Sequence, residues 1–368
     1  MMLLGVVLHS AITYGTFNYG DAWSLKDTNS TNAIYDLIVW VIHVFRMPIF
    51  FAISGFFSAL LFYERSSKKM IQNRLKRVLY PFLLFLFVLW PFIVFAWVFT
   101  GETISGNEAA LSVALKTLTD PLVYIPNNTF HLWFLNYLIY FTALSWVLAL
   151  LMKKLVKLSR IVKKLFELFF RYTIITQVIF ASFSFLLFYL LDVEDIDNNT
   201  FFIPDWKSWL LYLQFYLWGW LLFKSKDLLN KLTSFDYLFL ILAISVFALN
   251  ATFYNSITHI QHMVINAFMK WAFVFGIMGM FIRFFSSSNA KMRYLSDSSY
   301  WIYLIHLPLT ALIPGLMINL NMPTHIKFLI VLLTTSIICL LTYHYFVRST
   351  FIGKFLNGKK YPTKSIKK

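Results

Sequence analysis

The sequence predicts an all-α polytopic membrane protein with about ten transmembrane helices and both termini in the cytoplasm. Of its 368 residues, 59% are hydrophobic and 13% are charged, whereas soluble domains carry roughly 25% charged residues. A soluble domain of this length also needs a polar exterior, which this composition does not supply. Apolar runs of about 20 residues recur along the chain, and each can cross a bilayer core as a helix.

Ten apolar segments carry this prediction in chain order. They span residues 1–17, 34–63, 78–100, 130–152, 172–191, 209–223, 237–253, 264–285, 299–319 and 326–347. The second segment is longer than a bilayer core requires, so we expect it to tilt or to extend beyond the bilayer. Residues 154–171 alternate basic and apolar side chains at helical spacing, which predicts an amphipathic helix on the cytoplasmic surface.

The basic residues predict the orientation of these segments. They gather in every second loop and at the C-terminus, in residues 65–77, 153–171, 224–231, 283–293 and 348–368. The intervening loops hold most of the acidic residues. By the positive-inside rule, the basic loops and both termini are cytoplasmic. Because the net charge of +16 is divided among such loops, it indicates contact with the lipid bilayer and no nucleic-acid partner.

A single membrane domain is expected over residues 1–350, followed by a basic cytoplasmic tail over residues 351–368. Cys339 lies inside an apolar run, so we expect it to be a packing residue. His259 and His262 fall in an outward loop that offers no other plausible metal ligands beside them. No metal site is predicted.

Ionisable side chains inside the apolar segments are the first candidates for a functional site, because they are costly in lipid. His9 and His43 lie at similar depths, about 12 to 13 Å below the outer ends of their segments, so we expect them to meet at one level. Arg46 lies one helical turn after His43 and shares its face. Asp36 lies further out along the same face, toward the acceptor side.

These side chains have a functional and a structural interpretation. A histidine can take a proton from a hydroxyl and return it to a leaving group, and a buried arginine can stabilise an oxyanion. The same residues could instead only connect helices by hydrogen bonds. The coincidence of His9, His43 and Arg46 favours catalysis. Lys270 lies nearer the outer surface, where it can snorkel, so a structural role is at least as well supported there.

Several local sequences are more specific than composition. MLLGVVLHSAITYG contains His9, and HVFRMPIFFAISGFFSALLF runs from His43 to Phe62. The basic NRLKRVLYP follows, HLWFL begins at His131, and SYWIYLIHLPL begins at Ser299. In this order, and on ten segments, they resemble the acyltransferase 3 family of membrane acyltransferases over essentially the whole chain. FRMPIFFAISG and SYWIYLIHLPL are most similar to the branch of that family that succinylates osmoregulated periplasmic glucans.

The resemblance implies an enzyme of the cytoplasmic (inner) membrane. Such an enzyme takes an acyl group, with succinyl as one candidate, from cytoplasmic acyl-CoA and delivers it to a hydroxyl of an extracytoplasmic glycan, here a periplasmic glucan. His9 is then the catalytic histidine, and the Arg-x-x-Arg pair Arg74 and Arg77 lies on the donor side. Two guanidiniums at an inner helix end can hold the phosphates of CoA, although positive-inside anchoring explains them as well. The resemblance implies acyl-CoA as donor substrate, no bound cofactor, and the glucan-synthesis machinery as a partner.

Further side chains are expected to line the acceptor entrance or a cavity. His131 and Trp133 begin a segment at the outer face, where an interfacial anchor explains Trp133 equally well. His306 precedes Pro308, whose ring breaks the helical hydrogen-bond ladder and could open a cavity. Ser54–Gly55 is expected to allow a close helix approach or a bend.

The first segment departs from the family pattern. The family pairs its catalytic histidine with an arginine earlier in the same segment, and counting back from His9 at that spacing runs past Met1. We therefore expect the natural polypeptide to begin upstream and to supply this arginine.

Two other functional classes fit the buried histidines and arginine. A proton-coupled transporter would use them as a proton relay, but inverted repeats and paired broken helices, which are common in transporters, are not evident in the sequence. A membrane scaffold of a glycan-synthesis complex would need no chemistry. Thermal stabilisation by acyl-CoA separates these classes, because only the acyltransferase requires donor binding.

Overall fold

Every regular element of the structure is a helix, as the sequence predicts. The computed structural model describes residues 2–287, 289–358 and 361, and no strand occurs among them. An apolar segment in lipid has to satisfy its backbone N–H and C=O groups internally, which a helix does. Within these described residues, eight helical stretches are long and apolar enough to cross a membrane, and the chain is a multi-pass membrane protein. These stretches are Ile34–Arg65, Ser67–Ile104, Phe130–Lys154, Thr173–Leu191, Asp236–Ser256, His259–Phe285, Ala290–Met317 and Thr324–Val347.

Two of the ten predicted segments are not among these eight stretches. Leu3–Tyr14 is a shorter apolar helix, made of α1 (Leu3–Ala11) and one 3-10 turn. Helix α9 (Trp206–Lys224) is long enough, but its tryptophans, tyrosines and polar side chains make it less hydropathic than the eight. The count of ten spans and the cytoplasmic position of both termini therefore stay predictions.

The chain folds as two compact units. Unit 1 comprises Met1–Ile42, Lys76–Leu132 and Asn289–Lys368, and unit 2 comprises His43–Leu75 and Trp133–Ser288. Helix α2 (Ile34–Leu60) begins in the first unit and ends in the second. The two units thus alternate along the chain, so neither can be recognised as one continuous stretch of sequence.

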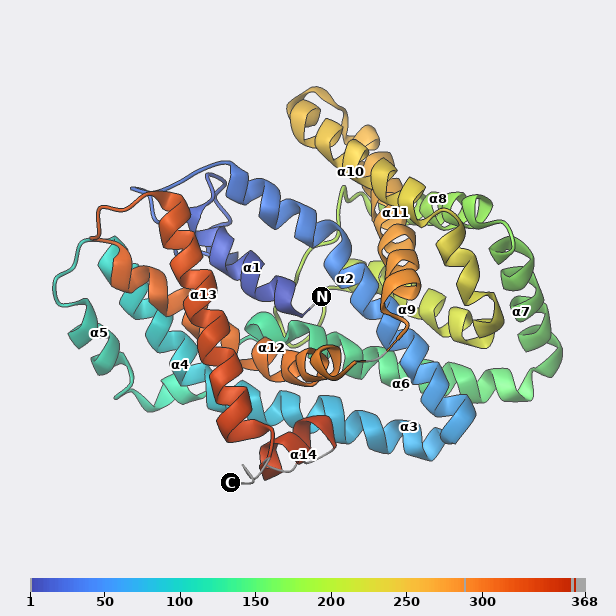
Figure 1. The fold of residues 1–368 in the computed structure, drawn as a ribbon, viewed down its shortest axis with the longest axis horizontal. Helices are drawn as coiled ribbons and strands as arrows, with labels where there is room; N and C mark the ends of the chain where they lie inside the picture. The colour runs from blue at the N-terminus through green and yellow to red at the C-terminus, as the bar shows by residue number, and fades with distance from the viewer. Residues whose placement is uncertain (1, 288, 359–360, 362–368) are drawn as a thin grey trace. The chain divides into compact units, whose positions relative to one another are not determined.

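Unit 1 is built around its longest helix, α12, which packs against α4, α13 and α1. The helices of this unit are α1, α4 (Tyr80–Ile104), α5 (Ala110–Thr117), α12 (Ala290–Met317), α13 (Thr324–Thr342) and α14 (Phe351–Asn357). Figure 1 shows α13 beside α1 and α12. Val6, Ile302 and Cys339 form a buried apolar cluster between these three helices, so Cys339 is the packing residue that the sequence predicts.

The end of the chain contains the predicted tail. Helix α14 is its described part, and residues 359–360 and 362–368 lie outside the described residues. The division between a membrane domain over 1–350 and a tail over 351–368 stays a prediction.

Unit 2 is built on helix α11, which packs against α10 and α8. Its helices are the later part of α2 with α3 (Ser67–Arg74), α6 (Trp133–Lys154), α7 (Val156–Phe170), α8 (Thr173–Leu191), α9, α10 (Asp236–Phe253) and α11 (His259–Phe285). Figure 1 shows α10 and α11 running side by side as a hairpin. The predicted amphipathic helix is α7: Phe166 and Phe170 are buried, whereas Lys157 and Lys164 are exposed.

Helices α2 and α9 cross closely inside unit 2. A side chain at Gly55 would collide with the carbonyl of Tyr216, and one at Gly219 would collide with the carbonyl of Ala52. The absence of side chains at both glycines lets the two backbones touch. The predicted close helix approach at Ser54–Gly55 is confirmed.

Candidate active site

Three histidines lie together inside unit 1, and His9 is one of them. His9 occupies the last turn of α1, and its ring centroid lies 5.3 Å from that of His306 on α12. The ring of His306 in turn lies 5.3 Å from that of His131, at 87° to it. His306 is fully buried and His131 is 7% exposed. Residues far apart in the sequence therefore form one cluster of imidazoles, which we call the histidine cluster.

Backbone carbonyls orient two of these rings. Nδ1 of His306 lies 2.7 Å from the carbonyl oxygen of Tyr303, and Nε2 of His131 lies 2.9 Å from that of Leu304. A carbonyl only accepts hydrogen bonds, so the neutral His306 carries its proton on Nδ1 and the neutral His131 carries its proton on Nε2. The lone pairs of the two neutral rings are then on the opposite nitrogens.

Pro308 explains why the carbonyl of Leu304 accepts from His131. In a regular helix the N–H of residue 308 would donate to the carbonyl of residue 304, and proline has no N–H. Helix α12 nevertheless continues through Pro308, and Nε2 of His131 takes the place of the missing donor. The imidazole of His131 thus supplies the hydrogen bond that Pro308 lacks, and the cavity expected at this break stays a prediction.

A second hydrogen bond holds the segment around His131 against α12. The hydroxyl of Tyr303 donates to the carbonyl of His131 at 2.7 Å. The preceding residue, Phe130, has a φ of 42°, which is uncommon for a residue with a side chain. Its ring packs between Trp90 and Trp97, with centroids 5.1 and 5.3 Å away. This packing stabilises the unfavourable backbone conformation that presents His131 to α12.

Trp23 forms the other wall of His9. Its ring stacks on the imidazole, with centroids 5.4 Å apart and planes inclined by 28°. The indole N–H donates to Oγ1 of Thr13 and to the carbonyl of Leu25, both at 3.0 Å. Trp23 is 3% exposed, so the stack is held inside the unit. Sequence reasoning missed Trp23 because it lies in a loop, outside every predicted segment, and only its residue type pointed to an interface.

Asp36 is held by the loop that follows α1. Its carboxylate accepts from the backbone N–H and the hydroxyl of Thr16, at 2.7 and 2.6 Å, and from the N–H of Phe17 at 3.1 Å. It also lies in the first turn of α2, where a negative charge is favourable. These contacts join the start of α2 to the loop after α1 within unit 1. The position of Asp36 at the acceptor stays a prediction.

His43 and Arg46 belong to unit 2, whereas His9 belongs to unit 1. The predicted meeting of His9 with these two residues therefore stays a prediction. His43 is half-buried and Arg46 is 8% exposed. Within unit 2, Arg46 lies in electrostatic range of the Tyr212 hydroxyl.

Trp133 is also part of unit 2 and not of the histidine cluster. Its ring contacts those of Tyr137 and Tyr212, at 5.2 and 5.6 Å, in a buried aromatic core. The core explains its burial without a ligand. Its predicted place at the acceptor entrance stays a prediction.

The two arginines of the Arg-x-x-Arg motif lie at a helical irregularity. Arg74 is the last residue of α3, and Arg77 lies in the π-helical turn Leu75–Leu79. Such turns are frequent at functional sites. Nη2 of Arg74 donates to the Ser58 hydroxyl at 2.6 Å, and the guanidinium of Arg77 lies against Gly358. Their proposed contact with the donor is untested.

Carboxylates of the loop after α8 pair with two basic side chains of α11 in unit 2. Nζ of Lys270, whose side chain is 3% exposed, lies 2.6 Å from a carboxylate oxygen of Asp195, and this ion pair fits the structural role expected for Lys270. His259 lies between Asp192 and Glu194, at 3.0 and 2.6 Å. Burial and the nearby carboxylates raise the pKa of Asp197 in the same loop. Within the described residues, no group of three His, Cys, Asp or Glu side chains is arranged to hold a metal ion.

The chain is similar to known proteins over almost its whole length. A family model described as an acyltransferase domain matches residues 1–344. Glucans biosynthesis protein C of Salmonella paratyphi A (strain ATCC 9150 / SARB42) and that of Salmonella agona (strain SL483) are each 27% identical to the chain over 388 residues. These alignments cover 99% of this chain and 93% of each relative. No solved structure matches the chain.

Proposed function

The chain belongs to the acyltransferase 3 family of membrane acyltransferases, and we propose that it moves an acyl group from cytoplasmic acyl-CoA to a hydroxyl of an extracytoplasmic glycan. The similarity to glucans biosynthesis protein C supports a glucan as the acceptor, and the inner membrane as the location. Succinyl is the acyl group to test first, because the motif versions in this chain are most similar to the succinylating branch.

The histidine cluster is the observation that carries this proposal. The rings of His9 and His306 and those of His306 and His131 have centroids 5.3 Å apart. His306 and His131 are buried, and His9 is half-buried. Imidazole is the side chain that gains and loses a proton near neutral pH. Hydrogen bonds to backbone carbonyls account for the orientation of His306 and His131, so the proposed chemistry is assigned to His9.

His9 is the proposed general base. The acceptor hydroxyl oxygen attacks the thioester carbonyl carbon while His9 takes the hydroxyl proton. The tetrahedral intermediate then collapses with cleavage of the carbon–sulfur bond. The leaving CoA thiolate takes the proton back from the imidazolium, so His9 is neutral again at the end of the cycle.

The neighbours of His9 have supporting roles in this scheme. The Trp23 stack restricts rotation of the imidazole, because the indole itself is hydrogen-bonded at its N–H. His306 lies beside His9, and His131 lies beside His306; both offer polar groups for the acceptor. His43 and Arg46 are proposed to stabilise the oxyanion of the tetrahedral intermediate.

Donor binding is assigned to Arg74 and Arg77. Guanidinium groups bind phosphates in a bidentate manner and stay charged at every physiological pH. The hydroxyl of Ser58 fixes one side of the Arg74 guanidinium, which reduces the entropy lost when a phosphate binds to it.

Reconstitution tests the donor and the acceptor together. The purified protein in proteoliposomes is given radiolabelled succinyl-CoA on the cytoplasmic side and a periplasmic glucan on the other, with acetyl-CoA as the matched donor. We expect label in the glucan as an alkali-sensitive ester. Label that stays with CoA for both donors would contradict acyl transfer to glucan.

Donor binding without turnover separates an enzyme from a scaffold. Acyl-CoA at about 100 times its Kd would stabilise the protein by about 2.7 kcal/mol, seen as a higher melting temperature. A scaffold without a donor site would melt at the same temperature with and without acyl-CoA.

A further inference from the structure

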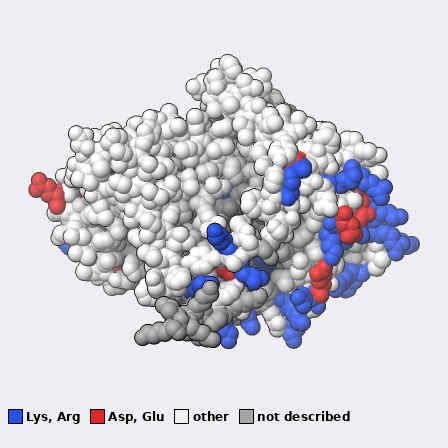
Figure 2. All heavy atoms as spheres, viewed as in Figure 1, with Lys and Arg blue, Asp and Glu red and all other residues white. Residues whose placement is uncertain are grey.

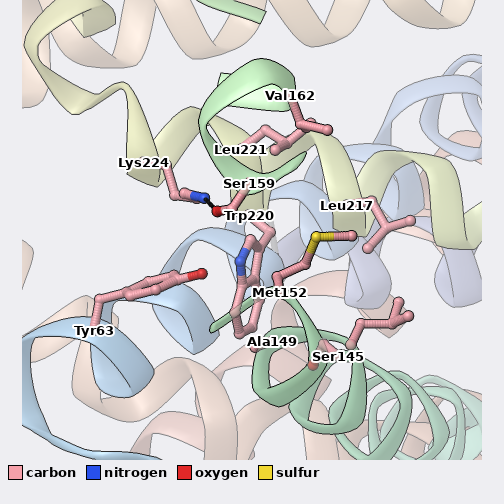
Figure 3. Close-up of a pocket in the computed structure, with 11 residues that line it drawn as sticks. Tyr63, Ser145, Ala149, Met152, Ser159, Val162, Leu217, Trp220, Leu221 and Lys224 are labelled. Carbon is pink, nitrogen blue, oxygen red and sulfur yellow. Dashed lines mark hydrogen bonds between the residues drawn. The ribbon is translucent and has the colours of Figure 1, made fainter. Parts of the chain in front are cut away.

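Unit 2 contains a cavity that the proposed reaction does not use. It has a volume of about 220 Å³ and is partly open. Its walls come from α6, α7, α9 and the π-helical segment Leu61–Arg65, and Figure 3 shows Met152, Leu217 and Leu221 extending into it. The walls are almost wholly apolar, and none of the three clustered histidines or the two motif arginines lines it.

One cationic group stands at the edge of this apolar space. Nζ of Lys224, the last residue of α9, donates to the Ser159 hydroxyl of α7 at 2.9 Å. The same ammonium lies over the ring of Tyr63, 5.6 Å from its centroid, within the range of a cation–π contact. Figure 3 shows Lys224, Ser159 and Tyr63 together at one side of the cavity.

The ammonium of Lys224 has no anionic partner among the described residues of unit 2. Its neighbours differ: Lys163 pairs with Glu167, and Lys226 pairs with Glu64. Lys163 also adds a like charge to the surroundings of Lys224. A half-buried cation beside another cation is stabilised when an anion binds to it.

The surface around this cation is basic. Figure 2 shows Lys and Arg side chains, with Asp and Glu side chains among them, gathered over the part of unit 2 that carries α7 in Figure 1. Lys153 and Lys154 end α6, and Lys157, Lys163 and Lys164 follow on α7. A basic amphipathic helix of this kind lies in the membrane interface, at the level of the lipid headgroups. Basic pockets between membrane helices at this level bind anionic lipid headgroups.

We propose that this cavity binds an anionic phospholipid, with one acyl chain between α6, α7 and α9 and its phosphate on Lys224 and Ser159. The apolar walls fit a hydrocarbon chain and not a sugar or a nucleotide. The ammonium and the hydroxyl at the edge match a phosphate, which accepts from both. The bound lipid then joins the interfacial helix α7 to two neighbouring helices of unit 2. This site goes beyond the proposed function and is independent of its donor and acceptor.

Native mass spectrometry of the full-length protein tests the site. The protein is released from micelles containing equal amounts of phosphatidylglycerol and phosphatidylcholine with the same chains. We expect retained phosphatidylglycerol in excess. In Lys224→Gln we expect this excess to fall about ten-fold, since a charge-assisted contact is lost. Lys157→Gln removes a neighbouring exposed lysine that does not line the cavity, and its excess should stay within two-fold of wild type.

A second variant tests the chain-binding part separately. Met152→Trp fills the cavity without changing charge, and we expect it to release both lipids to a similar extent. The site is overturned if Lys224→Gln keeps the wild-type excess, or if Met152→Trp, monodisperse on gel filtration, retains both lipids as wild type does. Displacement of phosphatidylglycerol by an equal concentration of acyl-CoA would also overturn it, since the cavity would then serve the donor.

Discussion

The two units bury polar side chains in different ways. In unit 2, two buried charges are held in ion pairs: Asp236, 1% exposed, binds Arg283 through two contacts of 2.8 Å, and Lys270 binds Asp195. In unit 1 the buried groups around His9 are imidazoles that contact rings and backbone carbonyls. An ion pair holds both charges in place, whereas an imidazole in neutral surroundings can exchange a proton. The comparison indicates that the paired charges of unit 2 contribute to stability, whereas the imidazoles around His9 in unit 1 can contribute to chemistry.

Unit 1 also contains one buried ion pair, and its position fits this distinction. Lys327 at the start of α13 lies 2.9 Å from Asp27, and both side chains are at most 3% exposed. The same loop is tied to α13 by Ser30, which donates to Thr324 at 3.1 Å. The pair therefore fastens the loop that carries Trp23, and it contributes to the site only through that loop.

Breaking the Asp236–Arg283 pair is the strongest test of the stabilising role of unit 2. Because Arg283 is 37% exposed, we expect Asp236→Asn to cost about 2 to 3 kcal/mol, below the range for fully buried pairs. Acyl transfer per folded molecule should stay within two-fold of wild type. Thermal unfolding in detergent and the transfer assay measure the two effects; normal stability with a large loss of transfer would reverse the comparison.

Arg74 tests whether unit 2 also contributes to binding. Arg74→Lys keeps the charge but loses the planar, bidentate donor, so we expect the KM for acyl-CoA to rise about ten-fold with little change in kcat. Lys69→Gln on the same helix is the matched control and should leave KM unchanged. Steady-state kinetics with varied acyl-CoA would exclude a donor role if the two variants behave alike.

Pro308 tests how the histidine cluster is held in unit 1. Pro308→Ala supplies the N–H that a regular helix directs at the Leu304 carbonyl, where it competes with Nε2 of His131. A neutral hydrogen bond is worth about 1 kcal/mol, so we expect transfer to fall about five-fold while the protein remains folded. Pro314→Ala, in the same helix, is the control. Equal rates for both proline variants would show that the His131 contact does not matter for transfer.

Substitution of an exposed charged side chain should have the smallest effect on transfer and on stability in either unit. Glu167→Gln removes the partner of Lys163 on the surface of α7, and such i,i+4 pairs contribute about 0.3 to 0.5 kcal/mol. We expect no measurable change in transfer and a melting temperature within about 1 °C of wild type. A clear loss of transfer would mean that the surface of α7 takes part in function.

The sequence predicted the parts of this fold that depend on local chemistry. The helical class, the extents of the apolar segments, the amphipathic helix α7 and the packing role of Cys339 follow from composition and spacing. Ten spans did not follow as clearly, because Trp and Tyr make α9 ambiguous on hydropathy. The alternation of two units along the chain depends on contacts between distant segments, which a single sequence does not display.

In the candidate site, too, local features could be predicted from the sequence and contacts between distant segments could not. His9 and His306 could be identified because each is an ionisable group inside an apolar segment. Their closeness to His131 could not, since it depends on a loop held by Tyr303. The partners of Asp36 and Lys270, which are Thr16 and Asp195, could not be identified from the sequence either. The partner of a buried polar group depends on tertiary contacts, which a single sequence does not display.

The rate of acyl transfer by His9→Ala tests the central claim most directly. Measured at saturating acyl-CoA beside His344→Gln, an exposed histidine in the same unit, it isolates the proposed general base. A positioned base contributes about 10²-fold to 10⁴-fold, so we predict a loss of at least about 10²-fold for His9→Ala and none for His344→Gln. Transfer by a folded His9→Ala protein at the wild-type rate would contradict the account.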